Sequence, residues 1–405
     1  MVKWLACLAL MTGCELFVNV PNATLANGDD GTDGGKSCSE SSPCVSPTPF
    51  CNTQSGTCVE CLTSPDCTMP ALAICDANVC RGCVADMECP SSNVCLGDGT
   101  CADPARVVYA SPTGTGATCT TATPCTLDTA IAQVEQPAAT QDIIKLAAGT
   151  YDRPAMSTID THGVIITGEG AILHGSGGAA IVMLYATGVP LTVMHVDFEL
   201  AGDYGAECTG AGGALTLDRV KMTGGGAGVY VNACPFTLDR STIDGNTLYA
   251  AYLIGSTVSI TNSFITNNSA MSLGGFVFAA GTTGTVEHVT VSGNGASSGA
   301  HAMRCTDVGH PTIRSSIIYG NGTPSIDPNC TVGFSVVDPD YTGGANNVSM
   351  DPLYVAPGTH DYHIQSGSPA AAHSDPASAQ VHDVDGDPRP QPTGSLADSG
   401  ADEIP

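Results

Sequence analysis

The apolar positions of residues 190–320 recur in a short phrase with a fixed internal spacing. Each phrase opens with Thr or Ser and an apolar residue, and apolar or small residues follow three and five positions later. The six sets are Val193/Val196/Phe198, Leu217/Val220/Met222, Leu238/Ser241/Ile243, Ile260/Ser263/Ile265, Val286/Val289/Val291 and Ile313/Ser316/Ile318. Their first residues lie 24, 21, 22, 26 and 27 positions apart. Strand-type segments at this period, joined by Gly and Asn turns, predict a solenoid with these positions facing its interior.

The last four phrases place an asparagine eight positions after their first apolar residue. These asparagines are Asn246, Asn268, Asn294 and Asn321. A side-chain amide both donates and accepts, so each can bond to the next coil and satisfy turn groups that would otherwise lack partners. The first two phrases carry Ala201 and Gly225 instead, and we expect no ladder there.

The segment before the phrases predicts how the solenoid begins. Residues 106–110 favour a strand, and residues 127–134 favour a short helix capped by Thr126 or Asp128. Residues 143–151 then read Ile-Ile-Lys-Leu-Ala-Ala-Gly-Thr-Tyr. This order resembles the start of pectin-lyase-like right-handed parallel β-helices. The resemblance implies an all-β fold, a three-sheet right-handed parallel β-helix over residues 104–350, whose N-terminal helix covers the otherwise open edge of the first coil.

The C-terminal residues 351–405 carry a second resemblance. They contain Asp-Pro-Leu-Tyr-Val at 351–355, Ser-Gly-Ser-Pro-Ala at 366–370, and Asp-Val-Asp-Gly-Asp-Pro-Arg-Pro at 383–390. Together with the coils, this segment resembles the choice-of-anchor Q β-helix proteins of bacterial surfaces. The resemblance implies a C-terminal cap and attachment to a surface, and it implies no reaction. Asp383, Asp385 and Asp387 resemble part of a calcium loop, but Pro388 interrupts the pattern, so we expect a structural role.

Cysteine spacing indicates a small stapled region at residues 38–103. Its twelve cysteines form three units: Cys38/Cys44/Cys51/Cys58, Cys61/Cys67/Cys75/Cys80 and Cys83/Cys89/Cys95/Cys101. Few apolar residues lie between them, so disulfides within each unit must replace a core, and four cysteines leave three connectivities open. Zinc at Cys58/Cys61 and Cys80/Cys83 is the alternative. In the β-helix we expect Cys119–Cys125, Cys208–Cys234 and Cys305–Cys330, the last two as staples between turns of adjacent coils.

The N-terminus predicts export. Lys3 precedes a short apolar stretch, and Met11-Thr12-Gly13-Cys14 resembles a bacterial lipobox. The resemblance implies a lipoprotein signal peptide at 1–13, lipidation of Cys14 and, with Glu15 next, an outer-membrane lipoprotein on the cell surface. An ordinary secretory signal is the alternative. Residues 14–37 are Gly-rich and acidic, which is typical of a flexible tether.

Charge excludes one class of partner. The chain has 12 Lys and Arg against 39 Asp and Glu, a net charge of −27 and a pI of about 4.3. A phosphate backbone would be repelled, so we expect no nucleic acid. An excess of acidic residues over basic ones does not by itself indicate catalytic chemistry.

Outward positions beside the third apolar residue of each phrase are the places where chemistry is possible. Asp197, Glu199 and Asp244 could hold calcium as a cofactor and could contact substrate. Lys221 is the candidate catalytic base. Phe264 and Tyr319 could stack on sugar rings. The adjacent pairs Asp218-Arg219 and Asp239-Arg240 predict an ion-pair ladder at a bend, and the whole face also fits the ordinary polar surface of a solenoid.

These patterns favour a surface lipoprotein whose β-helix binds a polysaccharide or another surface molecule, such as a protein. One alternative is a polysaccharide lyase or glycoside hydrolase that acts on an acidic glycan at the residues above. Another is a structural or adhesive protein. The sequence favours a non-catalytic role, because the expected carboxylate clusters of the related hydrolases are missing.

Overall fold

The computed structural model describes residues 38, 44–153, 155–175, 182–268, 275–295, 301–306 and 309–405. The predicted signal peptide at 1–13, the predicted lipidation site Cys14 and the predicted tether at 14–37 lie outside these residues. Within the described part of the chain, no helix is long and apolar enough to cross a membrane.

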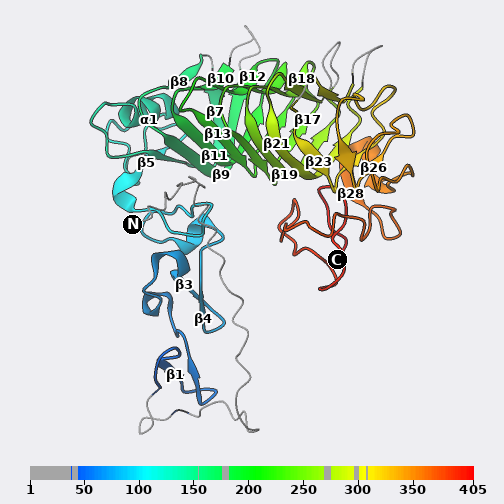
Figure 1. Ribbon diagram of the computed structural model, residues 1–405. Coiled ribbons are helices and arrows are strands. Elements are labelled where there is room, and N and C mark those ends of the chain that lie inside the picture. The colour runs from blue at the N-terminus through cyan, green and yellow to red at the C-terminus, as the bar shows by residue number, and fades with distance from the viewer. Residues whose placement is uncertain are drawn as a thin grey trace, which may run out of the picture.

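Most of the described chain winds into a parallel β-helix (Figure 1). Its larger sheet has 15 strands, and ten of them follow one another in the order β25-β23-β21-β19-β16-β13-β11-β9-β6-β5. Every pair within this sheet is parallel, as stacked coils require. The strands are β5 (Val107–Ala110), β6 (Ile143–Leu146), β7 (Gly149–Arg153), β9 (Val164–Gly175), β11 (Pro190–Glu199), β13 (Ala214–Asp218), β14 (Lys221–Thr223), β16 (Phe236–Asp239), β17 (Thr242–Asp244), β19 (Thr257–Thr266), β21 (Thr283–Ser292), β23 (Thr312–Arg314), β24 (Ile317–Ile318), β25 (Val332–Gly333) and β26 (Val336–Val337).

A second sheet of seven parallel strands closes the coils on another side, along the top of Figure 1. Its order is β22-β20-β18-β15-β12-β10-β8. The strands are β8 (Ser157–Ile159), β10 (Val182–Thr187), β12 (Tyr204–Thr209), β15 (Ala227–Asn232), β18 (Tyr249–Ile254), β20 (Phe276–Ala279) and β22 (Met303–Cys305). The helix α1 (Leu127–Val134) lies over the first coil and buries Leu127, Ala130, Ile131 and Val134, with Thr126 as its N-cap.

The repeated apolar positions form the core of this β-helix. All the apolar members of the six phrases are almost completely buried in one continuous cluster, at 2% exposure or less. The asparagine ladder is present beside them. Asn246 donates from its backbone and its amide to Asn268 Oδ1, Asn268 does the same to Asn294, and Asn294 to Asn321. These bonds satisfy buried turn groups coil by coil.

A column of left-handed residues bends each coil within the larger sheet. His195, Arg219, Arg240, Asn262, His288, Ser315 and Phe334 have φ between 44° and 56°. They hold equivalent places in successive coils. Arg219 and Arg240 lie between strands whose registers pair, as β13 with β16 and β14 with β17 do, whereas His195, Asn262 and His288 lie within β11, β19 and β21. The expected bend at Asp218-Arg219 and Asp239-Arg240 is therefore one part of a longer column.

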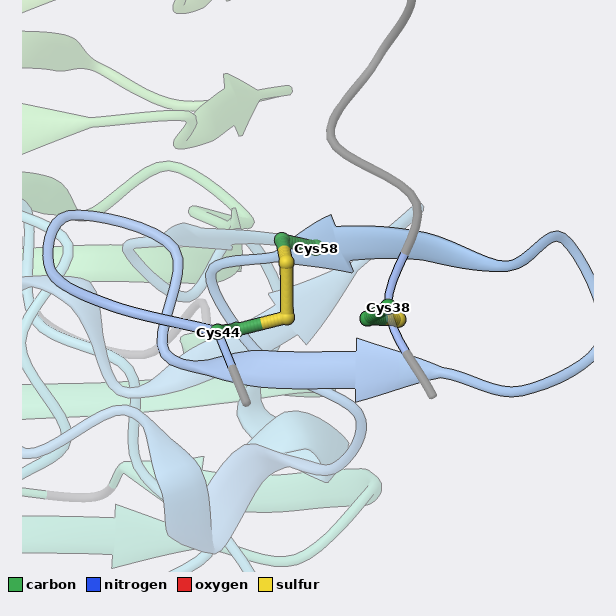
Figure 2. A group of neighbouring side chains, drawn as sticks. All are labelled: Cys38, Cys44 and Cys58. Carbon is green, nitrogen blue, oxygen red and sulfur yellow. A yellow bond between two sulfur atoms is a disulfide. The ribbon is translucent and has the colours of Figure 1, made fainter. Parts of the chain in front are cut away.

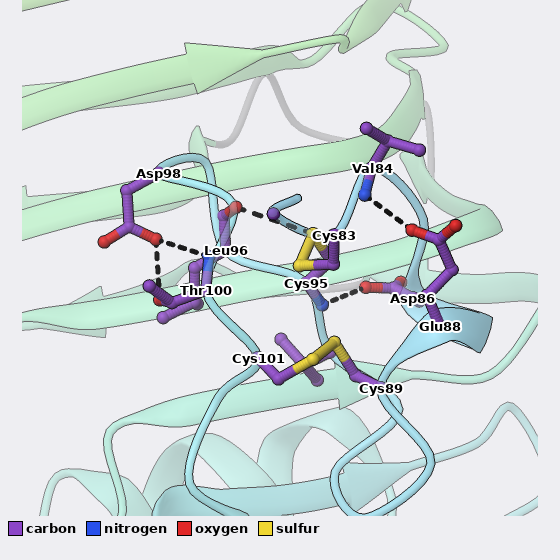
Figure 3. The surroundings of a disulfide bond; sticks show 12 residues. Cys83, Val84, Asp86, Glu88, Cys89, Cys95, Leu96, Asp98, Thr100 and Cys101 are labelled. Carbon is purple, nitrogen blue, oxygen red and sulfur yellow. Dashed lines mark hydrogen bonds between the residues drawn. A yellow bond between two sulfur atoms is a disulfide. The ribbon is translucent and has the colours of Figure 1, made fainter. Parts of the chain in front are cut away.

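Disulfides hold the region before the β-helix. Each unit joins its first cysteine to its third and its second to its fourth; Figure 2 shows Cys44–Cys58 beside Cys38, and Figure 3 shows the third unit. The six bonds are Cys38–Cys51, Cys44–Cys58, Cys61–Cys75, Cys67–Cys80, Cys83–Cys95 and Cys89–Cys101. Both Cys-x-x-Cys pairs are divided between disulfides of different units, so neither offers thiolates to zinc. This pairing excludes the zinc alternative.

Hairpins give the first two units their local form. β1 (Phe50–Asn52) pairs with β2 (Thr57–Val59), and β3 (Ile74–Asp76) with β4 (Val79–Arg81). Short 3-10 turns link them and the later segments: η1 (Ser64–Asp66), η2 (Pro70–Leu72), η3 (Asp86–Glu88), η4 (Pro104–Arg106) and η5 (Pro357–Thr359). Three more disulfides, Cys119–Cys125, Cys208–Cys234 and Cys305–Cys330, lie in the β-helix. Cys208 lies within β12 and Cys305 is the last residue of β22, so neither lies in a turn as expected.

The third unit is docked on the β-helix, whereas β1 to β4 extend away from it (Figure 1). The Lys145 ammonium forms a buried ion pair with Asp86, and Tyr109 donates its hydroxyl to the Ser92 carbonyl over 2.9 Å. Val94 packs with Ile143 in a small apolar cluster. This end of the disulfide region is therefore held in a defined position.

The C-terminal segment, residues 351–405, folds back over the outer face of the larger sheet (Figure 1). It contains β27 (Tyr354–Ala356) and β28 (Asp361–Ile364). His288 bonds to the Asp398 carbonyl and to Ser378 Oγ, and Ala401 donates to Thr290 Oγ1 over 3.0 Å. These contacts cover the distal coils of the larger sheet.

Candidate functional site

Five tyrosines share the outer face of the seven-stranded sheet. The register places Tyr185, Glu207, Tyr230 and Tyr252 at successive positions of one column. Tyr204 and Tyr249 stand at the start of their strands on the same face. All of these side chains are partly exposed. We call Tyr185, Tyr204, Glu207, Tyr230, Tyr249 and Tyr252 the tyrosine face.

The rings of the tyrosine face contact one another and surround a carboxyl group. Tyr230 and Tyr252 are stacked, with centroids 5.9 Å apart, and Tyr249 is tilted against Tyr252 at 5.6 Å. Tyr204, Glu207, Tyr230 and Tyr249 line a cavity of about 240 Å³ with Val182 and Ala206. Flat apolar rings beside polar hydroxyls form the kind of surface on which a sugar ring stacks.

Glu207 is the ionisable group of this cavity. Burial raises the pKa of its carboxyl above the ordinary value. Among the described residues it has no hydrogen-bond or ion-pair partner, so its oxygens are free to accept hydroxyl hydrogens from a ligand. A partly buried carboxyl with a raised pKa in an aromatic cavity is typical of a binding site.

The tyrosine face had a sequence signal that differs from the apolar phrase. Four six-residue segments share small or apolar residues at positions two, three and five and a Tyr or Glu at position four: 182–187, 204–209, 227–232 and 249–254. The apolar phrase does not include these segments, because they belong to the other sheet and lie between successive phrases.

The six candidates from sequence lie on a different face, on the larger sheet. Asp197 pairs in register with Lys221, and Lys221 with Thr242, which pairs with Phe264. Asp197, Glu199 and Lys221 are exposed. Neighbouring atoms desolvate Asp197 and raise the pKa of its carboxyl, and the nearby Lys221 partly offsets this rise. Glu199 and Asp244 both pair in register with Thr223 of β14, so they lie two strands apart.

The C-terminal segment covers the distal members of this set. Phe264 is only 8% exposed and packs edge-on against His363, with ring centroids 5.2 Å apart. Tyr319 packs against Ile317 and Ile364 in another apolar cluster. Phe264 therefore has no free face for a sugar ring, which corrects the expectation that it stacks on substrate.

Asp244 is held by protein partners. Its Oδ1 accepts from Thr266 and from Asn267, each over 2.7 Å, and its Oδ2 lies 2.8 Å from His360 Nδ1. Lys221 and Asp244 line one cavity of about 440 Å³, whereas Asp197 and Glu199 are not among its lining residues. The four residues thus do not converge on one cleft as a lyase site requires.

Two further groups bear on metal binding. Asp383 accepts from the backbone of Asp385, Asp387 and Glu403, so its oxygens close the C-terminal turn. His363, Asp385 and Asp402 each place one ligand atom within 4.8 Å of the others. His363 already bonds to Asp385 and Asp361, and these carboxylates raise its pKa to about 9 despite burial. The imidazolium thus supplies the positive charge that a metal ion would bring.

One comparison with known proteins, with a family model, agrees with the coil architecture. A family model described as "Right handed beta helix region" matches residues 204–347. The crystal structure of pectate lyase Pel9A is similar at a TM-score of 0.38 and 14% identity, over 74% of this chain and 96% of that chain. A search of curated protein sequences finds no match. The structure is a parallel β-helix preceded by a disulfide-rich region, and the family model describes its coils over residues 204–347 as right-handed.

Proposed function

We propose that this protein is an exported surface lipoprotein whose β-helix binds polysaccharide through the tyrosine face. The observation that carries the proposal is the stacked pair Tyr230 and Tyr252, beside a cavity that contains Glu207. Tyrosine rings stack on the apolar faces of sugars, and a carboxylate accepts hydrogen bonds from their hydroxyls. A row of such rings on consecutive strands suits an extended chain.

Other features agree with an exported binding protein. Nine disulfides among the described residues are typical of an oxidising compartment. Lipidation at Cys14 would anchor the chain, and the tether and disulfide units would separate the β-helix from the membrane. Calcium and catalysis at Lys221 are not part of this proposal, because the expected ligands do not converge.

The test is binding of the full chain to an array of neutral and acidic polysaccharides, followed by calorimetry on the strongest binder. Tyr230→Leu and Tyr252→Leu remove a ring but keep apolar bulk, and each should weaken binding about 3- to 10-fold. Tyr319→Leu is the matched control on the other sheet and should bind as the parent does. Absence of any glycan binding at millimolar concentrations, or unchanged binding by both tyrosine variants, would overturn the proposal.

A further inference from the structure

Glu207 stands far from positive charge on the seven-stranded sheet. Within the strands of this sheet, Glu207 and Arg304 alone carry charged side chains. The register across five adjacent strands runs through Glu207, Tyr230, Tyr252, Val277 and Arg304. At about 4.8 Å for each strand spacing, the two charged residues lie roughly 19 Å apart along the sheet, which is too far for an ion pair. The strands of this sheet therefore supply no counterion to Glu207.

The cavity beside Glu207 has aromatic walls. Tyr204, Tyr230 and Tyr249 line it together with Glu207, and its volume is about 240 Å³. This volume lies below the range of about 300–1,000 Å³ for sites of drug-sized molecules, so the cavity suits one ring or one charged group of a longer ligand. The face of a tyrosine ring is electronegative and attracts a cation within about 6 Å of the ring centroid. Rings and carboxylate thus favour the same sign of charge.

The titration of these groups points in the same direction. Burial raises the pKa of the Glu207 carboxyl. The pKa of the Tyr249 hydroxyl is also raised, first by burial and then by the neighbouring Tyr204 and Glu207. Both shifts oppose negative charge in the cavity, so a cation bound there would offset the cost of desolvating the carboxylate.

The lining residues favour an organic cation over a metal ion. Ca²⁺ takes about six to eight oxygen ligands, several of them from carboxylates, and the lining of this cavity contains one carboxylate. An ammonium group needs only acceptors for its N–H groups and a surface that attracts its charge. A carboxylate beside tyrosine rings provides both.

We propose that this cavity binds the ammonium group of an amino sugar. The Glu207 carboxylate accepts hydrogen bonds from the N–H groups, and the tyrosine rings around it attract the charge. Tyr252, which is stacked on Tyr230 outside the cavity lining, extends the aromatic surface toward an adjacent sugar unit. The inference rests on the proposed function and deepens it, because it narrows the polysaccharide to one that carries free amino groups.

Calorimetry on the full chain tests the inference with three trimers of the same linkage, built from glucosamine, N-acetylglucosamine or glucose. At about pH 6.5 a primary amine carries its proton, so only the glucosamine trimer is cationic. The parent should bind this trimer most tightly. Glu207→Gln should lose at least about tenfold in affinity for it, and much less for the glucose trimer, because a hydrogen bond between two charged groups is lost only with the former.

Two further variants separate specific binding from general attraction. The chain has a net charge of −27 and attracts any cation weakly, so Glu199→Gln is the matched control. It removes the same charge from an exposed position on the larger sheet and should bind all three trimers as the parent does. Tyr230→Leu should weaken the binding of all three, because each presents a sugar ring to the tyrosine face.

The outcomes distinguish this inference from the proposed function. Equal affinity of the parent for the three trimers, or an equal loss for the glucosamine and glucose trimers in Glu207→Gln, would overturn the amino-sugar inference alone. A loss for the glucosamine trimer in Glu199→Gln as large as that in Glu207→Gln would also overturn it. Unchanged binding of every trimer by Tyr230→Leu and Tyr252→Leu would overturn the proposed function, and the inference with it.

Discussion

The ring of Tyr230 stacks on the ring of Tyr252 with centroids 5.9 Å apart and 18° between their planes. The two residues are register partners on β15 and β18, so the spacing of adjacent strands brings the rings together. Their strands are held by the buried residues on either side of each tyrosine, Val229 and Val231 in one strand and Ala251 and Leu253 in the next. The coil core thereby pre-organises an aromatic surface before any ligand arrives.

Substitution Glu207→Gln should stabilise the protein at neutral pH while it weakens glycan binding. Because burial raises the pKa of Glu207 in the folded state, the folded chain retains a proton that the unfolded chain has already released. Stability is therefore lost as pH rises through the unfolded pKa and towards the folded one. The unfolding midpoint of the variant should exceed that of the parent at pH 7 and match it at pH 3. Glu199→Gln, at an exposed carboxylate, is the control, and an equal gain there would contradict the burial argument.

Substitution Asn268→Ala should cost about 2–4 kcal/mol of unfolding free energy, measured in denaturant. Asn268 Oδ1 accepts from the Asn246 backbone and side chain, and its amide donates to Ile243 O and to Asn294. The variant leaves several buried groups without partners in a region that admits no bulk water. The exposed Asn329→Ala should change stability by less than about 0.5 kcal/mol. An equal loss of unfolding free energy in both variants would mean that the ladder stabilises the protein no more than an exposed asparagine does.

Substitution Lys145→Met should release the third disulfide unit from the β-helix. Asp86 is 4% exposed, and without its ammonium partner it becomes a buried charge that costs about 3–5 kcal/mol. Hydrogen exchange of residues 83–102 should accelerate while the coils stay protected. The double variant Lys145→Met/Asp86→Asn removes the charge and should restore most of the protection. Unchanged exchange in the single variant would show that apolar contacts at Val94 suffice for docking.

Substitution His363→Gln should remove a pH dependence of the C-terminal segment between about pH 6.5 and 9. The bonds to Asp385 and Asp361 raise the pKa of His363 to about 9, above its ordinary value. This contribution is fully present below the unfolded pKa and is lost as pH rises through 9. Hydrogen exchange of residues 360–404 at pH 6 and pH 9.5 measures it. In the parent, protection of this segment from exchange, relative to the intrinsic rate at each pH, should be lower at pH 9.5 than at pH 6. In the variant, the protection should be the same at both pH values.

The repeat in the sequence determined the coil interior. Apolar residues that recur three and five positions after the first identify side chains such as Val193 and Phe198 as buried. Alternation along a strand and stacking between strands both have fixed periods, so the pattern repeats in each coil. The same periodicity placed the asparagine ladder, since Asn246 and Asn268 occupy one position in successive coils. The cysteine spacing determined that the region before the coils is stapled, but four cysteines per unit left the pairing open.

Which outward faces stay open was decided only by the tertiary structure. Phe264 and Lys221 are equivalent in the repeat, yet the C-terminal segment buries the former and leaves the latter in a cavity. Likewise Arg219 and Arg240 hold equivalent bends, yet Arg240 takes both carboxylates. A period specifies whether a side chain points in or out. Coverage depends on a C-terminal segment that packs back onto the coils, and charge pairing depends on side-chain geometry between neighbouring coils. Local spacing encodes neither contact.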